Sequence, residues 1–244
     1  GMGPEIFNVE NARVYGKWLG NRYKNEKNIV WILGGDRNPR NDNDVAIWRS
    51  MAAGIEEAIG RDKALMTFHP QPNDIRDGGS AKWFHNDDWL DFNMFQTGHC
   101  REINLWDRME YAYNLKPTKP VLDGEPIYED HPVCFNAKDL GTSSAYDIRR
   151  AAWLDVFSGA FGHTYGCHDI WQMYAPNRTP VNGPPRPWYL ALDLPGADQL
   201  KFLRKLIEAR PMFDRVPDKS LITDGLGAND RIQATRGNDY IFVY

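Results

Sequence analysis

Residues 29–36 read Ile-Val-Trp-Ile-Leu-Gly-Gly-Asp, and residues 120–126 read Pro-Val-Leu-Asp-Gly-Glu-Pro. Each stretch is a short apolar run that ends at glycine or aspartate and then presents an acid. Uninterrupted apolar runs of this length are typical of parallel strands that are buried on both faces. In a barrel of alternating strands and helices, the carboxyl ends of the strands carry the chemistry. The two stretches therefore predict a parallel α/β fold with Asp36 and Glu125 at its functional edge.

Helix-like and strand-like segments alternate on both sides of these stretches. Helices are expected where apolar residues recur every three to four positions, at residues 8–24, 44–59, 105–115, 144–157 and 198–209. Strands are expected at residues 29–33, 64–68, 89–95, 121–123 and 160–165, the last of them extending to residue 171. Asp44 is the expected N-cap of the second helix and Gly60 its expected stop, and Ser143 or Ser144 caps the fourth helix.

The character of the chain changes after residue 210. Short β-like runs occur at residues 221–223, 231–235 and 240–243, and turn-forming residues separate them at 224–225, 228–230 and 237–239. This pattern is typical of antiparallel strands joined by short turns. We therefore expect residues 211–244 to begin a small β-sandwich-like module that follows an α/β domain in residues 1–210.

Five parallel strands are fewer than the eight that close a (β/α)8 barrel. Two architectures remain open for residues 1–210. They are either the C-terminal part of a barrel of the TIM type, or a complete open sheet of five strands. The first is favoured because the segment starts on a helix and the chain ends within a strand.

The composition narrows the class of protein. The formal net charge is −4 with no basic block, which argues against nucleic acid or an anionic membrane surface as the main partner. No apolar run is long enough for a transmembrane helix, so no membrane insertion is expected. The chain has nine Trp, eleven Tyr and eleven Phe, which suit a sugar-binding cleft and a large core equally well. Three cysteines are too few for a disulfide framework or a zinc site, and at most one pair can form.

Four stretches together resemble one bacterial family. They are residues 16–23 (Gly-Lys-Trp-Leu-Gly-Asn-Arg-Tyr), 28–36, 95–99 (Phe-Gln-Thr-Gly-His) and 122–126. They resemble the apiosidase-like glycoside hydrolases, which are (β/α)8 barrels often followed by a β-domain named for collagen binding. The resemblance covers about residues 8–210.

The resemblance implies roles for the two acids. Asp36 corresponds to the acid/base after the fourth barrel strand, and Glu125 to the nucleophile after the seventh. The five expected strands then become strands four to eight, and the first three are missing from this chain. The resemblance further implies a retaining hydrolase of pectic oligosaccharides, with apiose as one candidate sugar, in the periplasm, at the cell surface or outside a bacterial cell.

The residues themselves are compatible with this chemistry. In a retaining mechanism Glu125 would attack the anomeric carbon while Asp36 protonates the leaving oxygen and then activates water. Gly34 and Gly35 would let the backbone approach a ligand closely. The competing interpretations are that Asp36 caps a helix or pairs with Arg37 or Arg40, and that Glu125 is an exposed loop acid.

Other side chains near strand ends are candidate sugar-binding residues. The alternatives are that they orient one of the acids by hydrogen bonding, form a surface charge (Arg37), or pack in the core or a loop. They are Arg37, His69, Gln96, His99, Asp123, His163, Tyr165, His168 and Trp171.

Two other functions compete with the glycosidase. A metal-dependent barrel hydrolase would use His69, His99, His163 or His168, but the sequence has neither a His-x-His on a strand nor an HExxH motif. A non-catalytic carbohydrate-binding module would keep the aromatic residues and lack a closed pocket. The favoured interpretation needs no cofactor and no metal, and its partner is an oligosaccharide or polysaccharide; the oligomeric state is not predicted.

Overall fold

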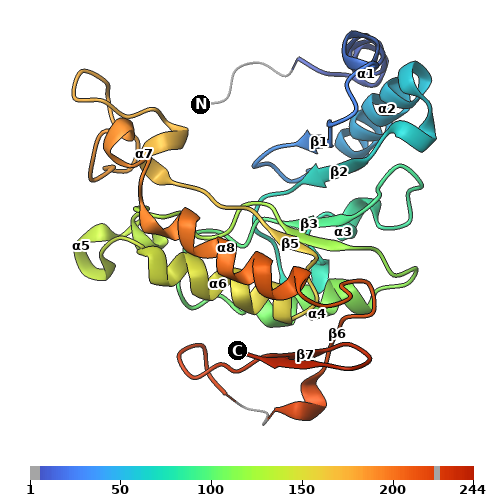
Figure 1. The fold of residues 1–244 in the computed structure, drawn as a ribbon. Helices are drawn as coiled ribbons and strands as arrows, with labels where there is room; N and C mark the ends of the chain where they lie inside the picture. The colour runs from blue at the N-terminus through green and yellow to red at the C-terminus, as the bar shows by residue number, and fades with distance from the viewer. Residues whose placement is uncertain (1–5, 223–225) are drawn as a thin grey trace. The chain divides into compact units, whose positions relative to one another are not determined.

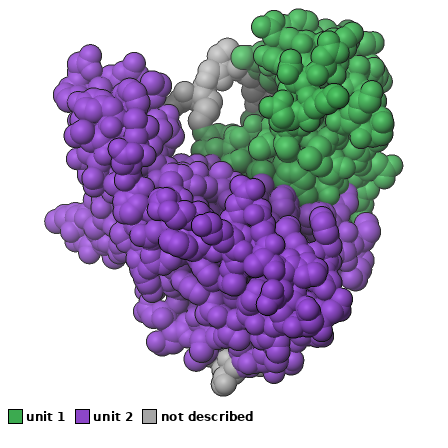
Figure 2. Space-filling model, viewed as in Figure 1, with its two compact units in different colours: residues 1–95 green, residues 96–244 purple. Residues whose placement is uncertain are grey.

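The computed structural model describes residues 6–222 and 226–244. The chain divides into two compact units, residues 1–95 and residues 96–244, which Figure 2 shows in green and purple. Each unit mixes helices with short strands (Figure 1). The expected turn at residues 224–225 and residue 223 of the first β-like run lie outside the described residues.

Unit 1 combines three helices with three short strands. Its elements are α1 (Val9–Tyr23), β1 (Trp31–Gly34), α2 (Asp42–Ile59), η1 (Arg61–Lys63), β2 (Met66–His69), η2 (Ile75–Asp77), α3 (Ala81–Phe84) and β3 (Asn93–Phe95). β1 and β2 are parallel, with Trp31 opposite Met66 and Gly34 opposite His69. The two strands therefore end side by side, at Gly34 and His69.

The packing of unit 1 holds this strand edge in place. Phe68 on β2 is fully buried and contacts the rings of Trp48, Trp83 and Phe84. Burying one such ring stabilises the fold by about 1.5–3 kcal/mol. α1 packs against α2 at unusually close range, because Gly54 leaves no room for a Cβ beside the backbone of α1.

Unit 2 carries a second parallel pair and a small antiparallel sheet. Its elements are α4 (Leu105–Asn114), β4 (Val121–Asp123), η3 (Val133–Phe135), α5 (Ala137–Leu140), α6 (Ala145–Phe157), β5 (Gly162–His163), α7 (His168–Trp171), η4 (Trp188–Leu190), α8 (Pro195–Glu208), β6 (Val216–Pro217), η5 (Lys219–Leu221), β7 (Ala234–Arg236) and β8 (Ile241–Val243). β4 and β5 are parallel, with Asp123 opposite His163. α6 and α8 lie side by side (Figure 1), and β6, β7 and β8 form an antiparallel sheet.

The alternation of strands and helices is confirmed, and the chain is a mixed α/β protein. The described residues form two short parallel pairs within the units and show no closed barrel. The expected helices at 8–24, 105–115 and 144–157 are confirmed, as is Ser144 as a cap through a reciprocal bond with Asp147. Gly60 ends α2 with a φ of 85°.

Several boundaries were wrong. Asn41 rather than Asp44 caps α2, because the Asn41 side chain accepts the Asp44 N–H while the Asp44 carboxylate binds Arg40. The expected strand at 89–95 is reduced to β3, since Leu90 closes a turn on Asp87.

In the C-terminal half of the chain, the expected extension of the strand at 160–165 to residue 171 was also wrong. Residues 168–171 form the short helix α7, whose last N–H returns to the carbonyl of Cys167. The β-like run that begins at residue 221 starts in the turn η5. The run at 231–235 overlaps β7, which extends to Arg236, and the run at 240–243 contains β8. α8 starts earlier than residue 198, because Pro195 occupies its first turn, where a missing N–H costs nothing.

Candidate active site

Asp36 lies just beyond the end of β1, on strained backbone. Gly34, Gly35 and Asp36 all have positive φ, of 82°, 133° and 45°. A Cβ on Gly34 would come within 2.5 Å of the Phe68 ring, so glycine is required there. The backbone N–H of Gly35 donates to the carbonyl of His69 at 3.1 Å, and that of Asp36 lies 3.3 Å from His69 Nδ1. His69 therefore fixes the turn that presents Asp36.

The Asp36 carboxylate is open to solvent. Its side chain is 61% exposed, and Arg37 Nη1 lies 3.7 Å from its Oδ2. The same Arg37 nitrogen donates to the Asp36 carbonyl at 2.6 Å. An exposed pair of this kind adds little stability, so the arrangement leaves the Asp36 carboxyl free to meet a solute.

Glu125 follows β4 in unit 2 and is more enclosed. Its side chain is 18% exposed, and its Oε1 lies 3.5 Å from Nε2 of His99. Its backbone carbonyl accepts the N–H of Gly98 at 3.1 Å. The segment 98–99 thus contacts Glu125 through both backbone and side chain.

A stack of three histidines lies behind Glu125. The rings of His99 and His131 are parallel within 26° with centroids 3.9 Å apart, and the ring of His168 meets His131 edge-on at 4.4 Å. Burial, followed by the proximity of His99, lowers the pKa of His131 to about 3. Burial also lowers the pKa of His168. Trp171 is exposed but donates its indole N–H to His168 Nδ1 at 3.2 Å, which fixes the ring.

Asp123 belongs to a different, fully buried network. Both its oxygens accept from Thr97, the hydroxyl at 2.5 Å and the backbone N–H at 3.4 Å. Asp155 of α6 faces it, and Asp155 Oδ2 lies 2.7 Å from Nδ1 of His163 on β5. Burial and then the neighbouring Asp155 raise the pKa of Asp123 to about 8. Burial raises the pKa of Asp155 as well and lowers that of His163 to about 4. The side chains of Asp123 and His163 therefore face buried polar groups rather than solvent.

Gln96 and Tyr165 are enclosed too. Gln96 is 6% exposed, and its side-chain oxygen has no hydrogen-bond partner within the described part of the chain. The Tyr165 hydroxyl donates to the buried Glu129 at 2.7 Å, and both oxygens of Glu129 accept the N–H of Gly196 at 3.1 Å. Glu129 thus caps the start of α8, where a helix favours negative charge.

The predicted site residues fall into three groups. Unit 1 holds Asp36, Arg37 and His69 together, and unit 2 holds Glu125, His99, His168 and Trp171 around one stack, with Asp123 and His163 in a separate network. Sequence reasoning missed His131, Glu129 and Asp155. Glu129 and His131 follow the Asp-Gly-Glu-Pro stretch closely, which is a usable signal. Asp155 lies in an ordinary amphipathic helix and gives none.

One group of described residues has metal-ligand geometry, namely Asp123, Asp155 and His163, whose ligand atoms lie within 4.8 Å of one another. The two aspartates are fully buried, and His163 binds Asp155 directly. His163 is thus the one candidate histidine of a metal-dependent hydrolase that belongs to such a group among the described residues. The direct bond accounts for the cluster without an ion.

Comparisons with known proteins identify related chains. The model of a family described as "Apiosidase-like, catalytic domain" matches residues 1–214. A solved structure described as a glycoside hydrolase is 43% identical with a TM-score of 0.85, covering 97% of this chain and 55% of its own. A glycoside hydrolase family 5 structure from Bacteroides vulgatus ATCC 8482 is 41% identical with a TM-score of 0.86, covering 97% and 53%. This chain thus spans about half the length of both. Among curated proteins, none matches significantly.

Proposed function

The chain belongs to the apiosidase-like catalytic-domain family, and from this premise we propose that it forms part of a retaining glycoside hydrolase that acts on pectic oligosaccharides of plant cell walls. The observation that carries the proposal is the family match across residues 1–214, together with two glycoside hydrolase structures that are 43% and 41% identical. The bond from apiose to a pectic side-chain sugar is the proposed substrate bond.

In the proposed mechanism, Glu125 is the nucleophile and Asp36 the acid/base. Each follows a strand of a parallel pair, which is where barrel enzymes carry catalytic groups. Glu125 would attack the anomeric carbon, and Asp36 would donate its proton to the leaving oxygen. Asp36 would then take a proton from water, which attacks the glycosyl-enzyme and releases the sugar. The exposed Asp36 carboxyl suits an exchange of protons with water.

The remaining candidate residues receive roles in the same proposal. Arg37 and His69 hold the Asp36 turn, and Gln96, Tyr165 and Trp171 contact the sugar. The exposed ring of Trp171 supports its contact. Asp123 and His163 are proposed to support the end of β4, after which Glu125 follows, through their network with Thr97 and Asp155.

The proposed architecture is a (β/α)8 barrel in which β1 to β5 are strands four to eight. The parallel pairs β1–β2 and β4–β5 support it. Residues 211–244 are proposed as the start of a β-sandwich-like module, which the antiparallel strands β6, β7 and β8 support.

The proposed location is the periplasm, the cell surface or the medium of a bacterium. The bond between Cys100 and Cys134 supports it, because disulfides persist in oxidising compartments. No helix among the described residues is long and apolar enough to cross a membrane.

The test uses Glu125→Ala and Asp36→Ala with activated aryl glycosides and azide, followed by NMR of the products. Both variants are expected to lose several orders of magnitude in turnover while keeping the fold. Azide should restore turnover in both, giving a glycosyl azide of inverted configuration from Glu125→Ala and of retained configuration from Asp36→Ala. The exposed Glu102→Gln is the matched control and should behave as the unaltered protein.

Near-normal turnover in either alanine variant would refute its assignment. Sugar binding without turnover, unchanged by Glu125→Gln, would show a carbohydrate-binding module instead. A panel that includes apiose-containing pectic oligosaccharides then identifies the sugar.

A further inference from the structure

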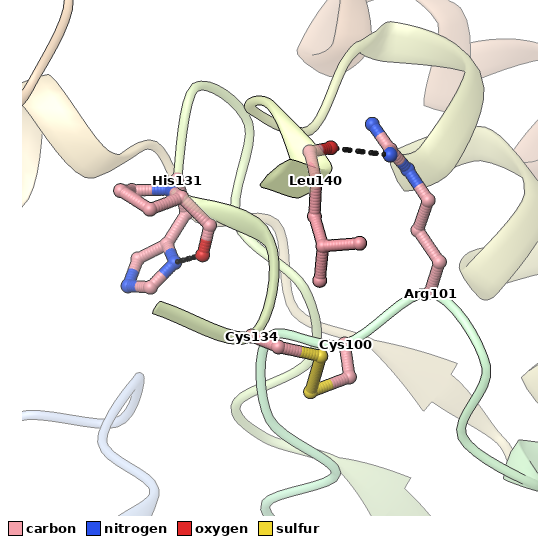
Figure 3. The surroundings of a disulfide bond; sticks show 6 residues. Cys100, Arg101, His131, Cys134 and Leu140 are labelled. Atoms are coloured by element: carbon pink, nitrogen blue, oxygen red, sulfur yellow. Dashed lines mark hydrogen bonds between the residues drawn. A yellow bond between two sulfur atoms is a disulfide. The ribbon is translucent and has the colours of Figure 1, made fainter. Parts of the chain in front are cut away.

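The segment that carries His99 is joined covalently to the loop that faces it. Cys100 follows His99 directly and forms a disulfide with Cys134, 34 residues later in the chain. The Cys134 N–H also donates to the carbonyl of His99 at 2.8 Å. Figure 3 shows His131 on the same loop as Cys134, so the disulfide links the two segments that carry the stacked rings of His99 and His131.

The loop has an unusual backbone conformation beside the disulfide. Cys134 and Phe135 adopt the left-handed region, with φ of 50° and 60°, which a flexible loop of L-residues rarely does. The Phe135 ring contacts the edges of His99 and His131, with centroids 5.7 and 4.9 Å apart. The Tyr128 ring lies 4.7 Å from His99. Three rings thus contact His99, while its Nε2 faces Glu125.

The contact between His99 and Glu125 depends sensitively on the position of the ring. His99 Nε2 lies 3.5 Å from Glu125 Oε1, at the outer edge of hydrogen-bond range. The buried Nδ1 of His99 has no partner in the described part of the chain. The imidazole with its hydrogen on Nε2 fits this arrangement, because it directs its one N–H at the carboxylate and buries no unpaired donor. A shift of a few tenths of an ångström decides whether the bond is made.

We propose that His99 is a positioning residue that holds the Glu125 carboxylate through Nε2, and that the Cys100–Cys134 disulfide keeps the His99 ring within reach. This inference rests on the proposed function of Glu125 as the nucleophile. An N–H donor stabilises the ionised form of a carboxyl group, and a nucleophilic carboxylate must be ionised and correctly aimed. His99 acts through Glu125 and does not contact the sugar.

Several other ionisable groups lie around the pair. Tyr128 and His131 face His99 from the segment after β4, His168 faces it from α7, and Asp130 acts on His168. Burial keeps the pKa of His131 at about 3 and lowers that of His168. We assign the acidic limb of the pH profile to Glu125, because the nucleophile of the proposed mechanism must be ionised.

A second clamp allows the disulfide to be removed without releasing the whole loop. Arg101 donates to the carbonyls of Leu140 and Thr142, each at 2.9 Å, and its Nε donates to Asp147 at 2.9 Å. Figure 3 shows Arg101 reaching Leu140 beside the disulfide. We therefore expect the double variant Cys100→Ser/Cys134→Ser to fold.

The first test compares His99→Phe, which keeps a stacking ring without the donor, with His99→Gln, whose amide nitrogen reaches about as far as Nε2. His99→Phe should lower kcat by about 10- to 100-fold, the loss of one hydrogen bond to a charged group. It should also move the acidic limb of kcat/KM to higher pH and leave KM within about twofold. His99→Gln should restore both. A raised KM with an unmoved acidic limb would show that His99 binds the sugar and would overturn the proposal.

The second test addresses the disulfide. The double serine variant, and the unaltered protein treated with a phosphine reductant, should both lose about tenfold in kcat with the same shift of the acidic limb. The reductant should not change the double variant further, and adding His99→Phe to it should cost less than His99→Phe alone, because the two changes act on one contact. Unchanged kcat and an unchanged limb on removal of the disulfide would overturn its role.

A measurement without substrate separates this inference from the proposed function. The Glu125 carboxyl carbon is followed by ¹³C NMR against pH in the unaltered chain, His99→Phe and His99→Gln, with Glu125→Gln to assign the signal. A midpoint that rises in His99→Phe and returns in His99→Gln supports the positioning role even if no glycoside is cleaved. Equal midpoints in all three proteins overturn it even if the chain is active.

Discussion

Replacing Asp123 by asparagine tests whether the buried network beneath Glu125 holds a proton. Asp123 is fully buried, and its carboxyl faces that of Asp155. Its pKa is raised from 3.8 to about 8, first by burial and then by Asp155. At neutral pH the folded chain therefore keeps a proton on Asp123 that the unfolded chain has lost. Asparagine has the same shape and no proton to lose.

The sign and size of the effect on the free energy of unfolding follow from the linkage between proton binding and folding. The stability that the protonated Asp123 contributes is complete below pH 3.8 and is lost as the pH rises toward its folded pKa of about 8. One such group lowers the free energy of unfolding by about 1.4 kcal/mol per pH unit between these limits. The raised pKa of Asp155 acts in the same direction.

His163 works the other way, over a different range. Its pKa is lowered from 6.5 to about 4, so unfolding takes up a proton between these values and stability rises with pH. The unfolded imidazole is half protonated at pH 6.5, so this slope falls close to zero only at about pH 7.5. Between pH 6.5 and about 7.5, the difference between the unaltered chain and Asp123→Asn removes the slope that His163 gives to both proteins and leaves that of Asp123.

The assay is urea unfolding, followed by tryptophan fluorescence at constant ionic strength, for the unaltered chain and Asp123→Asn. The variant should gain up to about 1.4 kcal/mol on the unaltered chain for each pH unit in this range. The exposed Asp193→Asn is the matched control and should run parallel to the unaltered chain. If Asp123→Asn also runs parallel, Asp123 is ionised in the folded chain and the reasoning about the network is wrong.

Two further predictions concern packing and capping. Gly54→Ala should destabilise the chain by about 1–3 kcal/mol in urea unfolding, because the new Cβ would collide with the backbone carbonyl of Arg13. The control is Ala53→Gly, which loses only about 1 kcal/mol of helix propensity. A Gly54→Ala chain as stable as the unaltered one would contradict the close packing of α1 and α2. Glu129→Gln should cost about 1–3 kcal/mol by the same measurement, because the amide loses the negative charge at the start of α8 and puts an NH₂ group in place of one of the two oxygens that accept the Gly196 N–H; an unchanged unfolding midpoint would show that this cap is dispensable.

The sequence predicted what depends on local pattern. The apolar runs that end at Gly34 and Asp123 became β1 and β4, and the helices with regular apolar spacing formed close to their expected bounds. Strand length was less predictable, because the residues at 89–92 are as apolar as a strand but are used in the core and in a turn on Asp87. An apolar run does not reveal whether it pairs with another strand or packs on its own.

The partners of the candidate site residues depend on contacts between distant segments. The Thr97 hydroxyl binds Asp123 from 26 positions away, and Cys134 reaches Cys100 across 34. Three scattered cysteines permitted one pair at most, and one pair formed. No local pattern distinguishes Cys167, which stays free and buried, from the two that bond.

Contacts with distant segments also distinguish Asp123 from Glu125. Both acids lie two positions apart at the end of one strand, so the sequence gives them equal access to a ligand. Their surroundings make them different: Asp123 is enclosed by Thr97 and Asp155, whereas the Glu125 side chain is 18% exposed and its Oε1 lies 3.5 Å from Nε2 of His99. A buried carboxyl that holds a proton is suited to support a fold, and a partly exposed carboxyl beside an imidazole is suited to react. The proposal that Glu125 rather than Asp123 is the nucleophile therefore has a physical reason that is independent of the family match.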